Sequence, residues 1–343
     1  MPRLSEGEDI LARQCIVVRA LGSGFVAAIL AAGARQLSRA PRTAALMADW
    51  PRDAAADALA MRFNAALHAL ARGGSMPALS ALYRDLSGDF DTVIGTAMAE
   101  ADGFIADWMR DTPQTNEVGR SAAIMAALLV LRERHNLPCE LLELGASAGL
   151  NLHLDRYGYD LGGRRIGPTD APVHVAPTWR GSAPRMGDIE IVSACGVDLN
   201  PIDVDDPAAC ARLMAYVWAD EPERADRLAQ ALAIARDAPP CVERGDIATW
   251  LPARLAMPQE AGACRTVIHT MALQYLDTVD AAAVEAAFQT AGARATDARP
   301  LARIGFEWTA SRDAVHLSLT SWPGGDTQHL ATCHAYGSWI DWR

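Results

Sequence analysis

The chain has 343 residues, which at roughly 150 residues per domain is enough for two globular domains. Half of the residues are hydrophobic and 21% are charged, which excludes a disordered, collagen-like or coiled-coil chain. The formal net charge is −11, and the basic side chains other than histidine are all arginines. An acidic chain without a basic run is a poor match for nucleic-acid phosphates, so we expect no nucleic-acid partner.

Membrane, secretion and metal signals are missing from the sequence. The longest apolar stretches, 25–32 and 122–131, fall short of the ~20 residues that span a bilayer, and the acidic N-terminal sequence is unlike a secretory signal. Seven cysteines without a C-x-x-C spacing favour reduced thiols over a disulfide framework or a zinc site. We therefore expect a cytoplasmic protein with no membrane partner and no metal.

Residues 1–135 carry helical patterns and almost no strand signal. Leu59, Phe63, Leu67 and Leu70 recur at three- and four-residue spacing, which places them on one helix face. Residues 121–131 are apolar nearly all round, as in a helix that is buried on every side. We expect a helical N-terminal domain over 1–135.

Residues 136–343 alternate short apolar runs with helical patterns, which predicts a mostly parallel sheet of βαβ units. Helices are expected to start at Asp206-Pro207 and Glu221-Pro222, and another to cover 278–291 before Gly292. The last two strands are close in sequence and predict an antiparallel hairpin at one edge of the sheet. The Gly/Pro-rich segment 158–188, with a turn at Gly162-Gly163, is expected to be an inserted flap, either mobile or fixed. The expected strands are 140–144, 190–197, 266–269, 302–307, 315–321 and 330–334, with a weaker one near Val242.

The segment 140–152 predicts a buried strand, a tight turn and the start of a helix. Gly145 and Gly149 permit a sharp turn and a close ligand, and backbone amides at the helix start are expected to face that ligand. With Glu143 two residues before the first glycine, the segment resembles the first motif of class I S-adenosylmethionine (SAM) methyltransferases, E/D-x-G-x-G-x-G, with Ser147 in place of the middle glycine. The resemblance implies that the acid interacts with the amino end of SAM and that the loop lies against the same ligand.

Two further acids follow the next two predicted strands. A dinucleotide-type fold has an acid about 20 residues past the glycines, at the end of the second strand. Asp198 lies 49 positions past Gly149, and removing the 31 residues of the flap leaves 18. The segment that begins at Gly245-Asp246 looks like the G-D-x-x-x-L segment whose acid contacts adenine in many methyltransferases. We therefore expect Asp198 to bind the ribose and Asp246 the adenine.

The same glycines also spell G-x-S-x-G at 145–149, the nucleophile elbow of α/β-hydrolases. That alternative makes Ser147 a nucleophile with His269 or His334 as its base. Chain order disfavours it, because the elbow normally follows several strands and this one follows the first. A third alternative, a non-catalytic ligand-binding protein of the same fold, stays open.

Several segments resemble an uncharacterised bacterial family, domain of unknown function 2332. The resemblance implies a helical N-terminal part and a methyltransferase-like C-terminal part, and it implies no established activity. The family more often has His-x-His-Gly where this chain has His334-Ala-Tyr-Gly, so a role for the second histidine is not carried over. The segments are Leu142–Tyr157, Gln114–Arg120, Gly196–Asp203, Val217–Asp220 and Gly337-x-Trp-x-x-Trp342.

Four other residues are candidates for binding or catalysis. Arg120 enters an apolar helix and needs a carboxylate partner from the protein or from a substrate. Asn116 is either a helix N-cap or a substrate contact. His269 ends the fourth strand, where methyltransferase-like folds place methyl transfer, and is either a general base or a hydrogen-bonded strand-end residue. Tyr275 follows as a substrate contact or a loop residue.

The expectation as a whole is an α/β protein with a helical N-terminal domain and a Rossmann-like, SAM-methyltransferase-type sheet. It acts on a small-molecule substrate with SAM as cofactor. The sequence leaves the methyl acceptor and the oligomeric state open.

Overall fold

The computed structural model describes residues 5–343, whose contacts divide the chain into two compact units. The first unit contains the chain up to Thr115 and, in addition, Pro207–Asp226. The second unit contains Asn116–Asp206 and Arg227–Arg343.

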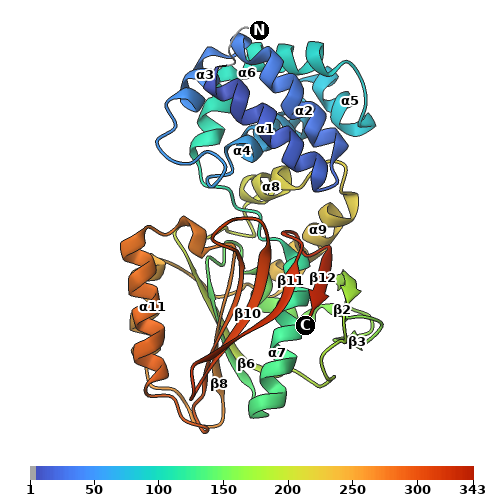
Figure 1. Ribbon diagram of the computed structural model, residues 1–343. Coiled ribbons are helices and arrows are strands. Elements are labelled where there is room, and N and C mark those ends of the chain that lie inside the picture. The colour runs from blue at the N-terminus through green and yellow to red at the C-terminus, as the bar shows by residue number, and fades with distance from the viewer. Residues whose placement is uncertain (1–4) are drawn as a thin grey trace. The chain divides into compact units, whose positions relative to one another are not determined.

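The first unit is built of helices (Figure 1). In α4, Leu59, Phe63 and Leu67 are fully buried, as their spacing predicts, whereas Leu70 is partly exposed. Proline begins α3 and α5, where its missing N–H is not needed by the helix. The helices are α1 (Glu6–Ala20), α2 (Gly24–Gln36), α3 (Pro41–Ala48), α4 (Leu59–Gly73), α5 (Pro77–Asp85), α6 (Phe90–Arg110) and α8 (Pro207–Tyr216).

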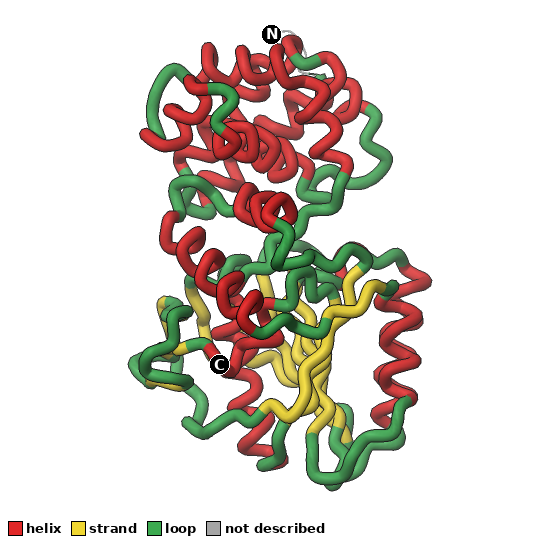
Figure 2. Tube along the Cα trace, turned by 180° about the vertical axis from the view of Figure 1, so that it is seen from behind, coloured by secondary structure: helices red, strands yellow, loops and turns green. Residues whose placement is uncertain are grey.

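The second unit is organised around a nine-stranded sheet, seen from behind in Figure 2. Its order is β5-β12-β11-β10-β9-β8-β1-β6-β7, and the five strands from β9 to β7 are parallel. The strands are β1 (Cys139–Leu144), β5 (Thr178–Arg180), β6 (Ile191–Asp198), β7 (Val242–Arg244), β8 (Cys264–Thr270), β9 (Leu301–Trp308), β10 (Val315–Trp322), β11 (Asp326–Cys333) and β12 (Trp339–Trp342).

Helices pack against this sheet, and the side chains between them form a hydrophobic core. Leu142 and Leu144 of β1 lie in one buried cluster with Leu251 of α10 (Ile247–Ala256) and Phe288 of α11 (Thr278–Gly292). Side chains alternate along a strand, so Glu143 points to the opposite face from these leucines. α9 (Pro222–Asp237) starts in the first unit and ends in the second.

Most of the expected elements are present. All seven expected strands occur, and α8, α9 and α11 begin at Pro207, Pro222 and Thr278. β10 and β11 are antiparallel as expected, but they do not form the edge of the sheet. β12 pairs with β11, and the short β5 pairs with β12, so the edge strand comes from a distant part of the chain.

The segment 158–188 combines two structures. A small sheet contains β2 (Gly158–Asp160), β3 (Arg165–Ile166) and β4 (His174–Val175), with the turn between β2 and β3 at Gly162-Gly163 as expected. β5 then joins the main sheet. The inserted segment therefore contains a small sheet of its own and one strand of the main sheet.

The expected domain boundary at residue 135 differs from the division by contacts. α7 (Ser121–His135) belongs to the second unit, where it contacts β9 and β10. Its residues 121–129 are buried, so the helix that is apolar all round is enclosed by sheet and neighbouring segments.

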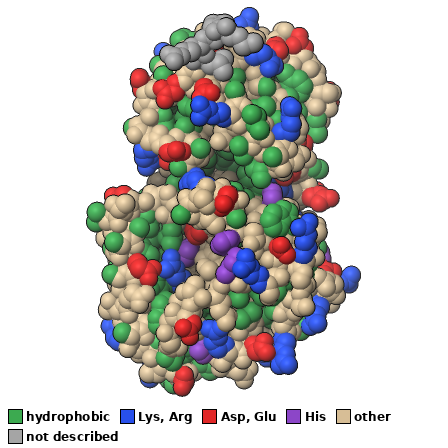
Figure 3. Space-filling view, viewed as in Figure 1, with side chains coloured by type: hydrophobic (Ala, Val, Ile, Leu, Met, Phe, Trp, Pro, Cys, Tyr) green, Lys and Arg blue, Asp and Glu red, His purple; other side chains and the backbone are tan. Residues whose placement is uncertain are grey.

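The surface carries mixed charge. On the face shown in Figure 3, acidic and basic side chains are interspersed in both units. Within residues 5–343, no helix is long and apolar enough to cross a membrane.

Candidate functional site

The strand order brings the ends of three strands together. β1 lies between β6 and β8, and the chain runs outward from β1 to β6 and β7 before it returns through β8 to β9. In open α/β sheets, ligands bind outside the carboxyl ends of the strands where the strand order reverses in this way. The candidate site therefore consists of Glu143 near the end of β1, the glycine loop (residues 145–149), Asp198 and residues 270–272.

The glycine loop has left-handed backbone at three positions, with φ of +71° at Gly145, +55° at Ser147 and +70° at Gly149. At both glycines, neighbouring protein atoms occupy the space that a side chain would need. A Cβ atom at Gly145 would lie 2.7 Å from Ala272 Cβ, and one at Gly149 would lie 2.8 Å from Pro240. Ser147 holds a conformation that costs a non-glycine residue about 1–3 kcal/mol and that recurs at functional sites.

The backbone amides of the loop are bound within the protein. Those of residues 145 and 146 donate to the Val197 carbonyl, and that of Ser147 donates to Asp198 Oδ2 at 2.9 Å. Asn116 Oδ1 accepts from the amides of Ala148 and Leu150 at 3.1 and 3.2 Å. We expected these amides to face a ligand. Because they are already paired, polar contacts with a ligand would have to come from side chains.

Glu143 is the most unusual side chain of the site. It is 1% exposed, and Asn151 Nδ2 donates to its Oε1 at 2.7 Å. Burial raises the pKa of Glu143 to about 8, which the Asn151 hydrogen bond opposes; the nearby Asp198 adds to the increase and Arg120 opposes it. The carboxyl group is therefore largely protonated at neutral pH.

Three buried polar atoms of this segment have no hydrogen-bond partner among the described residues: Glu143 Oε2, Ser147 Oγ and Asn151 Oδ1. Unpaired buried polar atoms are rare in folded proteins, and each costs about 1–3 kcal/mol. Asn151 Oδ1 is an acceptor, Ser147 Oγ belongs to a hydroxyl, and Glu143 Oε2 is an acceptor when the carboxyl group is ionised. Their location at the end of β1 matches a ligand that supplies N–H or O–H donors.

Asp198 ends β6, and Asp246 follows the adjacent parallel strand β7. Asp198 Oδ1 accepts from the Asn200 amide at 2.8 Å, so each of its oxygens holds one backbone N–H. Asp246 is the N-cap of α10, and its Oδ1 accepts from the Ala248 amide at 2.7 Å. The Gly245 amide donates to the Asp198 carbonyl, which ties the two loops together.

Arg120 lies near the end of β8, on the other side of β1 from Asp198 and β6, and is 7% exposed. Its Nε donates to the Ala335 carbonyl at 3.0 Å and its Nη1 to the Thr270 carbonyl at 3.3 Å, with the guanidinium over the Phe306 ring. Both of these acceptors are backbone carbonyls, and the expected carboxylate partner, from the protein or from a substrate, stays a prediction. The positive charge still acts on Glu143, whose pKa it lowers.

His269 is 2% exposed and has both ring nitrogens occupied. Nδ1 lies 2.7 Å from Glu307 Oε1, and Nε2 accepts from Arg303 Nε at 3.0 Å. Burial lowers the pKa of His269, with Glu307 opposing and Arg303 reinforcing that change. In this geometry the neutral ring is a hydrogen-bonded strand-end residue and has no nitrogen free to take a proton from an acceptor.

The segment after β8 turns sharply. Met271 has a φ of +57°, and Glu307 Oε1 accepts from the amides of Ala272 and Leu273 at 3.1 and 3.3 Å. Tyr275 ends the short helical turn that follows and is partly exposed. Glu307, which the sequence analysis did not single out, therefore holds both His269 and this turn.

The nucleophile-elbow alternative needs a base on Ser147. The Ser147 hydroxyl is buried and has no hydrogen-bond partner among residues 5–343, so no imidazole contacts it there. The arrangement lacks the nucleophile–base contact of a hydrolase.

The sequence analysis did not find two further groups of residues. Cys195, Cys241 and Glu243 come together on β6 and β7, because strand register rather than sequence spacing makes them neighbours. In the first unit, a pocket of about 310 Å³ is bordered by His68, Tyr83 and other residues of α4, α5 and 214–225. His68 stacks on Tyr83 there, with ring centroids 5.0 Å apart.

Fold and site together define an α/β protein whose parallel strands end at a polar, largely buried cluster of side chains. The family model described as "Uncharacterized protein conserved in bacteria (DUF2332)" matches residues 8–342. The chain belongs to this family. No curated protein and no solved structure matches the chain.

Proposed function

We propose that the second unit binds SAM at the carboxyl ends of β1, β6 and β7, and that the chain transfers a methyl group to a small-molecule acceptor. The observation that carries the proposal is the buried Glu143 carboxyl, with one oxygen unpaired among the described residues, where the strand order reverses.

In this proposal, the acids at the ends of β1, β6 and β7 would bind successive parts of SAM. Glu143 Oε2 would accept from the α-ammonium group, since a cation in direct contact favours the ionised carboxylate over the protonated form. Asp198, at the carboxyl end of β6, would accept from the ribose hydroxyls, since a carboxylate oxygen accepts more than one hydrogen bond. Asp246 would accept from the adenine amino group.

Bound SAM supplies a methyl group on a sulfonium centre, which is electrophilic without help from the protein. The residues of this chain then have to bind, orient and exclude water, and positioning of this kind supplies much of the rate enhancement of bimolecular reactions. Arg120 would attract a carboxylate on the acceptor, although its carbonyl contacts fix the guanidinium in place. A role for His269 as base would require Arg303 to release Nε2, so we leave that proton transfer out of the proposed reaction.

Calorimetric titration with SAM and with its demethylated product, S-adenosylhomocysteine, tests the binding step. We expect binding by the unmodified chain and weaker binding by Glu143→Gln and Asp198→Ala. Glu190→Gln is the matched control, because Glu190 is an exposed acid that precedes β6. Absence of heat at millimolar ligand would remove SAM from the proposal, and unchanged affinity in Asp198→Ala would remove its ribose role.

Transfer is tested separately from binding. SAM with a radioactive methyl group is incubated with the chain and a small-molecule extract, and labelled products are separated by chromatography. Product that depends on the chain and is lost in Asp198→Ala supports a methyltransferase. SAM binding with no labelled product would favour the non-catalytic ligand-binding alternative. A fluorophosphonate probe that labels Ser147 would instead support the hydrolase.

A further inference from the structure

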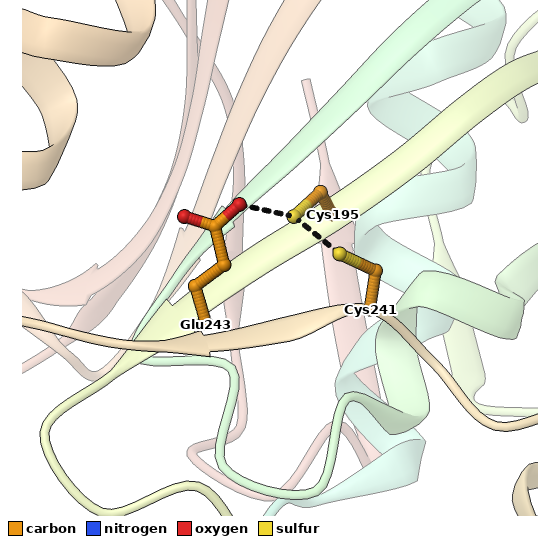
Figure 4. A group of neighbouring side chains, drawn as sticks. All are labelled: Cys195, Cys241 and Glu243. Carbon is orange, nitrogen blue, oxygen red and sulfur yellow. Dashed lines mark hydrogen bonds between the residues drawn. The ribbon is translucent and has the colours of Figure 1, made fainter.

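Cys195 and Cys241 are lateral neighbours on two parallel strands. Gly196 of β6 pairs with Val242 of β7, so the residues one position earlier also lie side by side, and the Gly196 amide donates to the Cys241 carbonyl at 2.8 Å. Neighbouring strands are about 4.8 Å apart, within the Cα separation that a disulfide accepts. The two sulfur atoms are 2.8 Å apart (Figure 4).

The charged groups around the thiols leave little place for a metal ion. Arg254 Nη2 lies 3.0 Å from Cys195 Sγ and 2.7 Å from Glu243 Oε1, where a bound cation would have to be. The Trp250 indole donates to Glu243 Oε2 at 2.6 Å. Both oxygens of the potential carboxylate ligand are therefore paired, and a guanidinium already supplies the positive charge.

The two thiols differ in accessibility. Cys241 is exposed and Cys195 is buried, so an oxidant in solution reaches Cys241 first. Burial raises the pKa of Cys195 to about 12, with a further increase from the neighbouring Cys241 thiol. Cys195 therefore keeps its proton until a base takes it. Cys195 Sγ donates to Glu243 Oε1 at 3.5 Å, and the Trp250 hydrogen bond lowers the pKa of Glu243, so the thiol lies beside an ionised carboxylate.

We propose that Cys195 and Cys241 are an oxidation site that hydroperoxides convert into a reversible intramolecular disulfide, and that this bond acts on the glycine loop. The Cys241 sulfur attacks one peroxide oxygen, the O–O bond breaks, and Cys241 becomes a sulfenic acid while water (or an alcohol) leaves. The Cys195 sulfur then attacks the Cys241 sulfur, the S–O bond breaks, and the Cys195 proton passes to the departing hydroxide, which leaves as water. The thiols together lose two electrons, and the peroxide gains them.

The path to the glycine loop is short. Pro240 and Val242 flank Cys241, and a Cβ atom at Gly149 would lie 2.8 Å from side-chain atoms of each. Cys195 is three residues before Asp198, which binds the Ser147 amide. Joining the sulfurs moves both strands at the points that support the loop.

The test treats the full chain with hydrogen peroxide, alkylates the remaining thiols and maps linked peptides by mass spectrometry. We expect a 195–241 link that dithiothreitol reverses and that Cys241→Ser abolishes. Cys333→Ser, which changes a buried thiol on β11, is the control and keeps the link. Cys139 and Cys264 have the same lateral register on β1 and β8 but are both buried, and we expect them to stay unlinked.

Three outcomes would overturn the oxidation site: both thiols free after peroxide, Cys241 oxidised to the sulfinic acid without a link, or a stoichiometric metal ion held by the thiols. The second part is tested by hydrogen exchange of peptides that cover 143–152, with no ligand present. We expect at least a twofold change in exchange rate on oxidation in the unmodified chain and none in Cys241→Ser. Equal exchange in the reduced and disulfide forms would remove the effect on the loop.

Discussion

Glu143 shows at the scale of one residue how a buried carboxyl group can lower stability. Its pKa is about 8 in the folded chain, against an ordinary value of 4.5. Between these two pH values the folded state holds a proton that the unfolded state has lost. The free energy of unfolding therefore falls as pH rises through this window, by up to about 1.4 kcal/mol for each unit of pKa difference.

Glu143→Gln removes this pH dependence and keeps an oxygen that accepts from Asn151. We expect the variant to gain stability relative to the unmodified chain as pH rises from 5 to 9, reaching about 5 kcal/mol as an upper bound. Urea unfolding at several pH values measures the difference. Glu190→Gln, on an exposed acid, should follow the unmodified chain throughout. If the free energy of unfolding of Glu143→Gln also changes with pH in parallel with that of the unmodified chain, the carboxyl is not held protonated by burial.

The same variant separates stability from binding. If Glu143 serves a cationic ligand, Glu143→Gln should weaken SAM binding while it stabilises the free chain at alkaline pH. Such opposed effects are common where a site retains a group that the fold alone does not favour.

At the scale of elements, the sequence predicts what depends on neighbours in the chain. Apolar runs locate the seven main strands, and proline marks the starts of α8 and α9. The two- to four-residue strands β2 to β5 and β12 are too short to show alternation, and β5 is a strand of the main sheet through its pairing with β12, far along the chain. The pairing of Cys195 with Cys241 depends on strand register in the same way.

The glycine loop gives a second example. Its glycines and Glu143 are visible in the sequence, but the Asn116 side chain that holds its amides lies 32 and 34 residues upstream of the residues it binds. Such a side-chain contact has no local pattern. Asn116 was therefore considered a helix cap or a substrate contact, whereas the structure has it supporting the loop.

Asn116→Ala tests this support. The change leaves the buried amides of Ala148 and Leu150 without their acceptor and puts alanine at a φ of +38°. We expect a loss of about 2–4 kcal/mol in the free energy of unfolding, together with faster hydrogen exchange of the loop. Asn116→Asp retains the acceptor oxygen and should lose clearly less. Full stability and unchanged loop exchange in Asn116→Ala would contradict this role.

At the scale of the molecule, the division into units could not be read along the chain. A helix that is apolar on all sides, such as α7, has the same pattern whether helices or a sheet enclose it, so the boundary was expected at residue 135 rather than 115. The return of residues 207–226 to the first unit is equally hidden. α8 has an ordinary start at Pro207, and only contacts show that it packs on α4.

This discontinuity predicts how a truncated chain behaves. A fragment of residues 116–343 retains α8 but lacks α4, so Leu213 and Tyr216, which are buried in the full chain, become exposed. Exposed apolar surface of this kind promotes association. We expect the fragment to aggregate in size-exclusion chromatography, and the same fragment with Leu213→Ser and Tyr216→Ser to be largely monomeric with a cooperative thermal transition. In the full chain, the double substitution should instead destabilise the first unit by several kcal/mol, because it removes buried apolar groups. A monomeric, unsubstituted fragment would mean that α8 does not need the helices of the first unit.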